Sequence, residues 1–163
     1  MWKLPAKSQG SELVAIVADS SSLIGLHAIG RLNLLEFVYG EVIIPPAVAR
    51  EVQASVPLPR WIIIQTPVPL AMEFPSQLGS GEREAIALAS QIHPEALLVD
   101  DLPARRTAGR LGLRLSGAVG TLIAAKRLGL LEEIRPDLDA LRAASFHISA
   151  ELYRIALKLA GEH

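Results

Sequence analysis

Two adjacent carboxylates, Asp100 and Asp101, directly follow the apolar run Leu97–Val99. A short apolar run that ends in acids is typical of a buried strand with charged groups at its carboxyl end. Two neighbouring like charges repel each other unless a cation lies close by, and either a metal ion or the nearby Arg105 and Arg106 can serve. The motif therefore predicts a site that depends on a positive partner.

A third carboxylate, Asp19, follows another continuous apolar run, Leu13–Ala18. Such a run is typical of a strand that is buried on both faces in a parallel sheet. Ligands of these sheets bind outside the carboxyl ends of the strands. We therefore expect Asp19 and the Asp100–Asp101 pair to lie at one edge of the sheet.

Two glutamates on predicted helices are candidates for the same edge. Glu51 lies in the predicted helix 47–54, and Glu82 lies in the first turn of the predicted helix 81–92. Glu82 shares a helix face with the apolar residues three, four and seven positions later, whereas Glu84 does not. We therefore expect Glu82 to point inward and Glu84 to point outward.

The composition is that of one folded domain. The chain has 163 residues, half of them hydrophobic, and its 16 Lys and Arg against 17 Asp and Glu give a net charge of −1. This balance excludes nucleic-acid binding by bulk charge alone. We expect residues 1–12 to be an N-terminal extension and 13–163 a single domain. The sequence shows no signal peptide and no membrane span, and it lacks cysteine, which fits a cytoplasmic protein.

Apolar runs and helical patterns alternate along the chain. The predicted strands are 13–18, 42–44, 61–64, 97–99 and 113–115. The predicted helices are 23–29, 33–39, 47–54, 81–92 with Ser80 as its cap, 104–111, 118–128, 138–144 and 149–160. This alternation predicts an α/β domain with a mainly parallel central sheet.

The carboxylates predict a particular metal chemistry. Without cysteine, and with no shared ligand spacing among the histidines, the ligands are oxygen atoms, which suit Mg²⁺ or Mn²⁺. Such ions activate water and neutralise the charge of a phosphodiester during in-line attack. The residues therefore point to hydrolysis of a phosphate ester.

Four segments in this order resemble the PIN-domain family: 19–24, 44–52, 81–89 and 99–106. Within that family the chain is similar to a prokaryotic subfamily of VapC-related toxin-type nucleases, and segment 115–129 resembles it too. The resemblance covers roughly residues 13–161. It implies a three-layer α/β/α sandwich and an Mg²⁺- or Mn²⁺-dependent endoribonuclease. It also implies the toxin of a type II toxin–antitoxin pair, a small antitoxin partner and a homodimer.

Carried over residue by residue, the resemblance implies the site. Asp19, Glu51 and Glu82 match the first three acidic positions, and we favour Asp100 over Asp101 for the last. The implied catalytic residues are Asp19, Glu51, Glu82 and Asp100, and the implied metal ligands are Asp19, Glu82, Asp100 and Asp101. Many PIN nucleases have aspartate where this chain has Glu82, and the longer side chain would shift the metal geometry or weaken the site.

Residues 102–131 contain no Asp or Glu but several Lys and Arg. Next to an acidic pocket, such a stretch can hold a phosphate backbone. We expect Arg105 and Arg106, with Ser20, Ser21 and Thr121, to contact the substrate. The alternative is an ordinary solvated helix face.

Each acid also has a structural interpretation. Asp19 is compatible with a helix cap, Glu82 with a favourable place in the helix dipole, and Asp101 with an ion pair to Arg105 four residues later. Glu51, beside an apolar stripe, is compatible with a solvated edge. The convergence of these acids on one sheet edge, in a familiar order, favours the site.

Three other functions are weighed against the nuclease. The first is a catalytically weak PIN-like module that binds RNA or protein. An aspartyl phosphatase would need an acid two residues after Asp19, where the chain has Ser21. A phosphoacceptor domain is loosely matched by Asp100, Thr121 and Lys126, but the short spacing of the last two predicts one helix. The apolar stripe of the last helix fits the core, a second subunit or an antitoxin.

Overall fold

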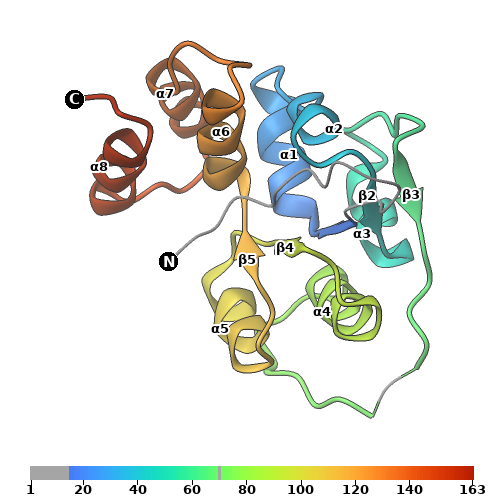
Figure 1. The fold of residues 1–163 in the computed structure, drawn as a ribbon. Helices are drawn as coiled ribbons and strands as arrows, with labels where there is room; N and C mark the ends of the chain where they lie inside the picture. Colours follow the sequence, from blue (N-terminus) through green and yellow to red (C-terminus); the bar gives the residue numbers. More distant parts are fainter. Residues whose placement is uncertain (1–14, 70) are drawn as a thin grey trace.

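The computed structural model describes residues 15–69 and 71–163, which form a five-stranded sheet. The order is β3-β2-β1-β4-β5 and every pairing is parallel (Figure 1). The strands are β1 (Ile16–Ala18), β2 (Val42–Ile44), β3 (Ile62–Ile64), β4 (Ala96–Leu98) and β5 (Leu115–Ser116). The predicted α/β class with a mainly parallel sheet is confirmed.

The two central strands carry the most apolar runs of the sequence. Every residue of β1 is fully buried, and so are Leu97 and Leu98 of β4. At the edge, Ile64 of β3 is 52% exposed. Burial on both faces explains the continuous apolar runs, because a strand with one wet face would alternate. The expected extension 1–12 and the first two residues of predicted strand 13–18 lie outside the described residues.

Helices cover both faces of the sheet, giving the expected three layers. In Figure 1, α1, α2 and α6 lie on one face and α4 and α5 on the other. The described helices are α1 (Ser20–Ala28), α2 (Leu34–Tyr39), α3 (Pro46–Val52), α4 (Ser80–Ile92), α5 (Leu102–Arg110), α6 (Ala118–Arg127), α7 (Arg135–Ala143) and α8 (Ala150–Leu159). A bilayer crossing needs a long apolar helix, and the described residues contain none.

Several local predictions were wrong. Gly79, not Ser80, is the N-cap of α4, and Ser80 is its first helical residue. Helix α5 begins two residues before the predicted 104, because the Asp101 carboxylate caps it. Strand β5 lies one to two residues later than predicted. Glu84 does not point outward: its carboxylate accepts the Ala47 N–H at 2.8 Å, in the first turn of α3, where the helix dipole favours an anion.

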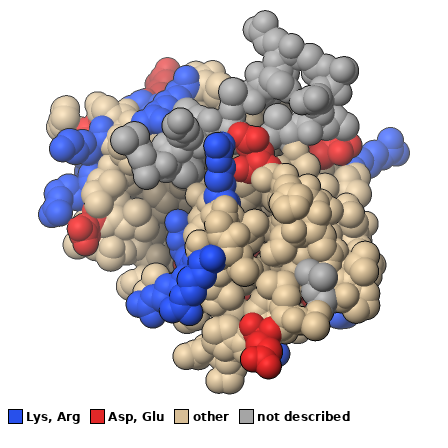
Figure 2. Space-filling view, turned by 60° about the horizontal axis from the view of Figure 1, so that its bottom comes forward, with Lys and Arg blue, Asp and Glu red and all other residues tan. Residues whose placement is uncertain are grey.

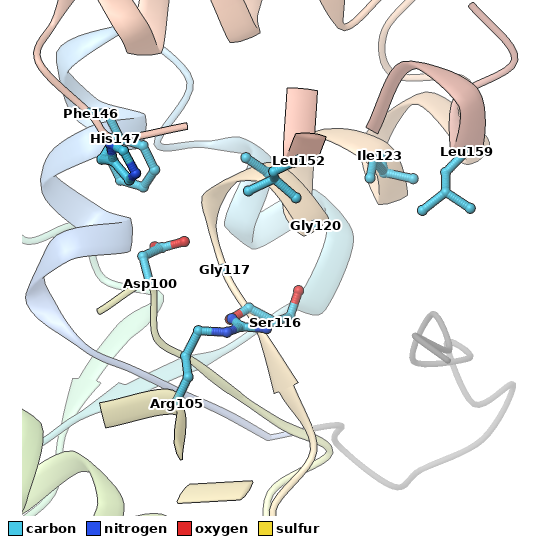
Figure 3. Close-up of a pocket in the computed structure, with 11 residues that line it drawn as sticks. Asp100, Arg105, Ser116, Gly117, Gly120, Ile123, Phe146, His147, Leu152 and Leu159 are labelled. Atoms are coloured by element: carbon cyan, nitrogen blue, oxygen red, sulfur yellow. The ribbon is translucent and has the colours of Figure 1, made fainter. Parts of the chain in front are cut away.

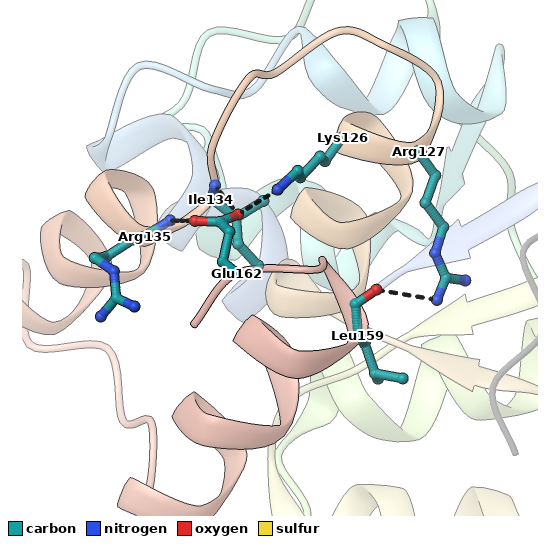
Figure 4. Close-up of polar contacts among 6 residues, drawn as sticks. All are labelled: Lys126, Arg127, Ile134, Arg135, Leu159 and Glu162. Atoms are coloured by element: carbon teal, nitrogen blue, oxygen red, sulfur yellow. Dashed lines mark hydrogen bonds and ion pairs between the residues drawn. The ribbon is translucent and has the colours of Figure 1, made fainter.

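The segment after α8 is held in part by one carboxylate, that of Glu162. Its Oε2 accepts from Lys126 Nζ at 2.9 Å and from the Ile134 N–H at 2.8 Å, and its Oε1 accepts from the Arg135 N–H at 3.2 Å (Figure 4). Burial alone would raise the pKa of Glu162, but these donors and the Lys126 charge lower it below its ordinary value. We call these contacts the C-terminal clasp. The clasp ties α8 to α6 and α7.

Candidate active site

The register of β1 and β4 brings the first and last acids to one edge of the sheet. Ala18 pairs with Leu98, and the Asp19 N–H donates to the Leu98 carbonyl at 2.9 Å. Asp19 therefore leaves β1 where the chain runs on from β4 to Asp100. We call the carboxylates of Asp19, Glu51, Glu82, Asp100 and Asp101 the acidic edge.

Asp19 is the most buried member of the acidic edge, with 1% of its surface exposed. Its Oδ1 accepts the Ser20 N–H at 2.7 Å, so Asp19 is the N-cap of α1. Its pKa is raised from 3.8 to about 7, mainly by burial and also by the charges of Glu82 and Glu51, against the hydrogen bonds from Ser20. The cap interpretation is therefore correct but incomplete, because a cap alone does not explain a carboxylate that resists ionisation.

Glu51 joins three helices. Its Oε2 accepts from Ser20 Oγ at 2.7 Å in α1, and its Oε1 accepts from the Gly81 N–H at 3.0 Å in α4. A Cβ at position 81 would come within 2.5 Å of the Glu51 carboxylate, so a larger residue there would displace this carboxylate. Although Glu51 is exposed, these bonds hold its carboxylate toward Asp19. Glu51 is thus more than a solvated edge residue.

Glu82 lies in the first turn of α4 and is partly buried. Its Oε2 accepts the N–H of Gly79, the N-cap residue, at 3.1 Å. Burial raises the pKa of Glu82, and the charges of Asp101 and Glu51 add to this against the Gly79 hydrogen bond. Its apolar neighbours Ala85 and Ile86 are buried, which confirms the inward face of this helix.

Asp100 and Asp101 have different surroundings. Asp100 Oδ2 accepts from Ser22 Oγ at 2.5 Å, and the Ala118 N–H lies 3.3 Å from Oδ1. Burial raises the pKa of Asp100 against these bonds and the Arg105 charge. A Cβ at position 117 would overlap the Asp100 carboxylate, so a larger residue there would force this carboxylate to move. Asp101 instead caps α5 through the Ala104 N–H at 3.1 Å.

Arg105 does not pair with Asp101, contrary to the alternative considered from the sequence. Its Nη1 donates to the carbonyls of Val99 at 2.7 Å and Ser116 at 3.0 Å, which ties β4 to β5 at the acidic edge. Its charge still acts on Asp100. Arg105 is therefore placed to support the acids, with at least part of its guanidinium already engaged.

The remaining predicted substrate residues are placed differently from one another. Ser20 contacts both Asp19 and Glu51, and Arg106 is exposed on α5. The Ser21 hydroxyl is buried without a hydrogen-bond partner among the described residues. Thr121 is fully buried: its hydroxyl donates to the Gly117 carbonyl and lies 3.2 Å from the Tyr39 hydroxyl. That placement gives Thr121 no access to a phosphate.

Three residues that the sequence did not single out as site members belong to this edge. Ser22 donates to Asp100, and Gly81 and Gly117 leave space for the carboxylates of Glu51 and Asp100. Ser22 carries a weak signal, since three serines in a row exceed what one helix start needs. The two glycines each stand directly at the start of a predicted helix, a position that does not reveal which side chain approaches.

The donor set fits a hard divalent cation in its chemistry. All members are carboxylates, and burial and mutual repulsion raise the pKa values of Asp19 and Glu82, which a bound cation would relieve. Within residues 15–69 and 71–163, no three His, Cys, Asp or Glu side chains converge on one point. The carboxylates therefore lie near one another without forming a closed ligand cage.

An α/β sheet with acids at its carboxyl edge is shared by several classes of protein, and comparison with known families identifies which one. A family model described as a PIN domain matches residues 15–162, so the chain belongs to the PIN-domain family. PIN domains are generally nucleases that depend on divalent metal ions. No curated protein and no solved structure matches the chain significantly.

Proposed function

We propose that this protein is an endoribonuclease that hydrolyses RNA phosphodiester bonds with Mg²⁺ or Mn²⁺. The observation that carries the proposal is the crowding of carboxylates at the acidic edge: Asp19, 1% exposed, has a pKa raised to about 7 and faces Glu51 and Glu82. Buried acids with strongly shifted pKa values concentrate at functional sites. Membership of the PIN-domain family supplies the reaction class.

In this proposal four carboxylates share one task and the fifth has another. Asp19, Glu82, Asp100 and Asp101 would hold the ion, which when bound supplies an activated water and neutralises phosphate charge. Ser20 holds Glu51 beside Asp19, and Ser22 with the Ala118 N–H orients Asp100. Glu51, which is exposed and held at both oxygens, is placed to accept a proton from the attacking water.

The RNA backbone would follow the basic surface beside these acids. Figure 2 shows the face that lies at the bottom of Figure 1, where Lys and Arg side chains gather mainly toward the left with scattered acids between them. Arg106 and Arg110 of α5 are exposed and make no hydrogen bond or ion pair within the described part of the chain. Phosphates are the natural partners of such side chains.

The proposal extends to the partners implied by the family resemblance. In it, the protein is a cytoplasmic toxin that pairs with a small antitoxin and forms a homodimer. Co-purification with the product of a neighbouring small gene would test the antitoxin, and the molecular mass in solution would test the dimer.

The second candidate is a PIN module that binds RNA or protein with little catalysis. It is favoured by the lack of three converging ligands in the described residues and by Glu82 where many PIN nucleases have aspartate. A calorimetric titration with Mn²⁺ separates the candidates, because the binding module needs no ion. The phosphoacceptor alternative is disfavoured, since Thr121 and Lys126 share α6 and Lys126 belongs to the clasp.

The direct test is cleavage of a labelled structured RNA with Mn²⁺, with Mg²⁺ and with EDTA. We expect metal-dependent cleavage by the wild type, lost in Asp19→Asn and Asp100→Asn. Asp139→Asn is the matched control, since Asp139 is an exposed aspartate on α7 that accepts from Tyr153 Oη. Cleavage that survives in EDTA, or that falls equally in the control, would overturn the proposal.

A further inference from the structure

The acidic edge continues into a pocket that the proposed hydrolysis does not use. Its volume is about 280 Å³, near the lower end of the roughly 300–1,000 Å³ of ligand pockets. Asp100 and Arg105 lie at one end, and Ile123, Leu152 and Leu159 form an apolar side (Figure 3). The pocket therefore has room for one small, largely apolar group that enters from the acids.

Two aromatic side chains, Phe146 and His147, complete the lining and lie together in Figure 3. The chain turns back after α7 through Ser145, at φ 67°, and the Phe146 N–H donates to the Leu141 carbonyl at 2.9 Å. The ring of Phe146 packs on α1, where a Cβ on Gly25 would come within 2.7 Å of it. The Phe146 side of the pocket is thus packed against α1, and His147 beside it is exposed.

We propose that this pocket binds one unpaired nucleobase of the substrate strand, beside the phosphodiester held at the acidic edge; this inference rests on the proposed function. Proteins read single-stranded RNA by stacking splayed bases on aromatic side chains. A base is flat and apolar on its faces, which suits the apolar side of the pocket, whereas its phosphate belongs outside these walls. Asp100 belongs to both the acidic edge and the pocket. A base bound in the pocket would therefore lie beside the cleaved bond.

Helix α8 offers a matched pair of variants. Leu152 lines the pocket and is 40% exposed, while Ile155 on the same helix does not line it and is 42% exposed. In Leu152→Asp a carboxylate replaces an apolar wall, and in Ile155→Asp the same charge faces elsewhere. Thermal unfolding of both variants verifies that they fold equally well.

Two probes are titrated into the protein and followed by NMR. They are AMP and ribose 5-phosphate, which lacks the base. We expect AMP to bind the wild type more tightly than ribose 5-phosphate, and Leu152→Asp to weaken AMP binding about ten-fold while Ile155→Asp does not. Equal binding of the two probes, or equal loss in the two variants, would overturn the base pocket.

RNA cleavage separates this inference from the proposed function. In an active enzyme Leu152→Asp should raise KM about ten-fold and leave kcat nearly unchanged. A wild type that binds AMP in this pocket but cleaves no RNA would reject the nuclease and keep the base site. A wild type that cleaves RNA, with KM equal in both variants, would keep the nuclease and reject the base site.

Discussion

Two buried carboxylates in this molecule have opposite surroundings. Glu162 in the C-terminal clasp receives two backbone N–H groups and the Lys126 ammonium, and its pKa falls below its ordinary value. Among the described residues, Asp19 at the acidic edge accepts hydrogen bonds from Ser20 alone and faces two further carboxylates, and its pKa rises to about 7. The first arrangement stabilises a charge within the fold. The second leaves a charge for something outside the fold to neutralise.

This contrast separates structural acids from functional ones better than exposure does. The Glu162 side chain is 11% exposed and Asp19 is 1% exposed, so neither acid has much exposed surface. The difference lies in what surrounds each charge. Glu162 has an ion pair and two backbone donors, whereas Asp19 has like charges close by. Removing each charge should therefore have opposite consequences for stability and activity.

The largest effect is expected for Asp19→Asn. Cleavage should fall at least about 100-fold, because changes even to groups behind the metal ligands cost 10–100-fold. Stability at pH 8 should stay equal or increase, since the neutral amide still accepts the Ser20 N–H and no longer opposes Glu51 and Glu82. RNA cleavage assays measure the activity, and thermal unfolding measures the stability. A variant that is both active and less stable would reverse the assignment of Asp19.

Divalent cations should stabilise the wild type mainly above pH 7. The folded pKa of Asp19 lies above its ordinary value of 3.8, so the stability gained from its proton is complete below pH 3.8 and lost as pH rises through about 7. Mn²⁺ at 100 times its Kd should then add about 2.7 kcal/mol at pH 8 and less at pH 5. Unfolding curves with Mn²⁺ or EDTA measure this. An equal gain in Asp19→Asn would place the ion elsewhere.

Glu162→Gln should have the opposite signature to Asp19→Asn. Loss of charge-assisted bonds to Lys126 and two backbone donors should reduce the free energy of unfolding by about 2 kcal/mol at pH 7, with cleavage per folded molecule nearly unchanged. Because the folded pKa of Glu162 is lowered, its contribution is present above pH 4.5 and disappears as pH falls through the folded pKa. The exposed Glu133→Gln serves as the control in urea unfolding. Equal stability of the two variants would show that the clasp contributes nothing.

The sequence predicted the acidic edge more completely than the contacts within it. The hydrophobic periodicity and the apolar runs place Asp19 and Asp100 at strand ends, because the apolar residues of a buried strand follow one another in the sequence. The hydrogen bonds of Glu51 were not predictable from the sequence, since its partners Ser20 and Gly81 lie 31 and 30 residues away. The clasp was missed for the same reason: Glu162 follows the last helix and meets Lys126 and α7 only in the folded chain.

Helix ends show a second limit of the sequence. Asp101 is a cap that was expected only as a metal ligand or ion-pair partner, and Ser80 was expected as a cap that Gly79 provides. Caps depend on which residue adopts an extended backbone, and neighbouring Gly, Ser and Asp all tolerate it. Thr121 was expected at the substrate, but the α6 face that carries it is buried against α2.

The smallest effect is expected for the glycines beside the acidic-edge carboxylates. In Gly117→Ala the new Cβ would overlap the Asp100 carboxylate, so the carboxylate must move from Ser22 and Ala118. We expect cleavage to fall about ten-fold, as for other displaced supports of metal ligands. Gly109 of helix α5 gives the matched control, Gly109→Ala, because the nearest atom to its new Cβ, in the side chain of Leu115 of β5, is 4.0 Å away. There alanine should add about 0.5–1 kcal/mol of stability and leave cleavage unchanged. If both substitutions were equally harmless to cleavage, the position of the Asp100 carboxylate would not matter, and Asp101 would become the principal acid after β4.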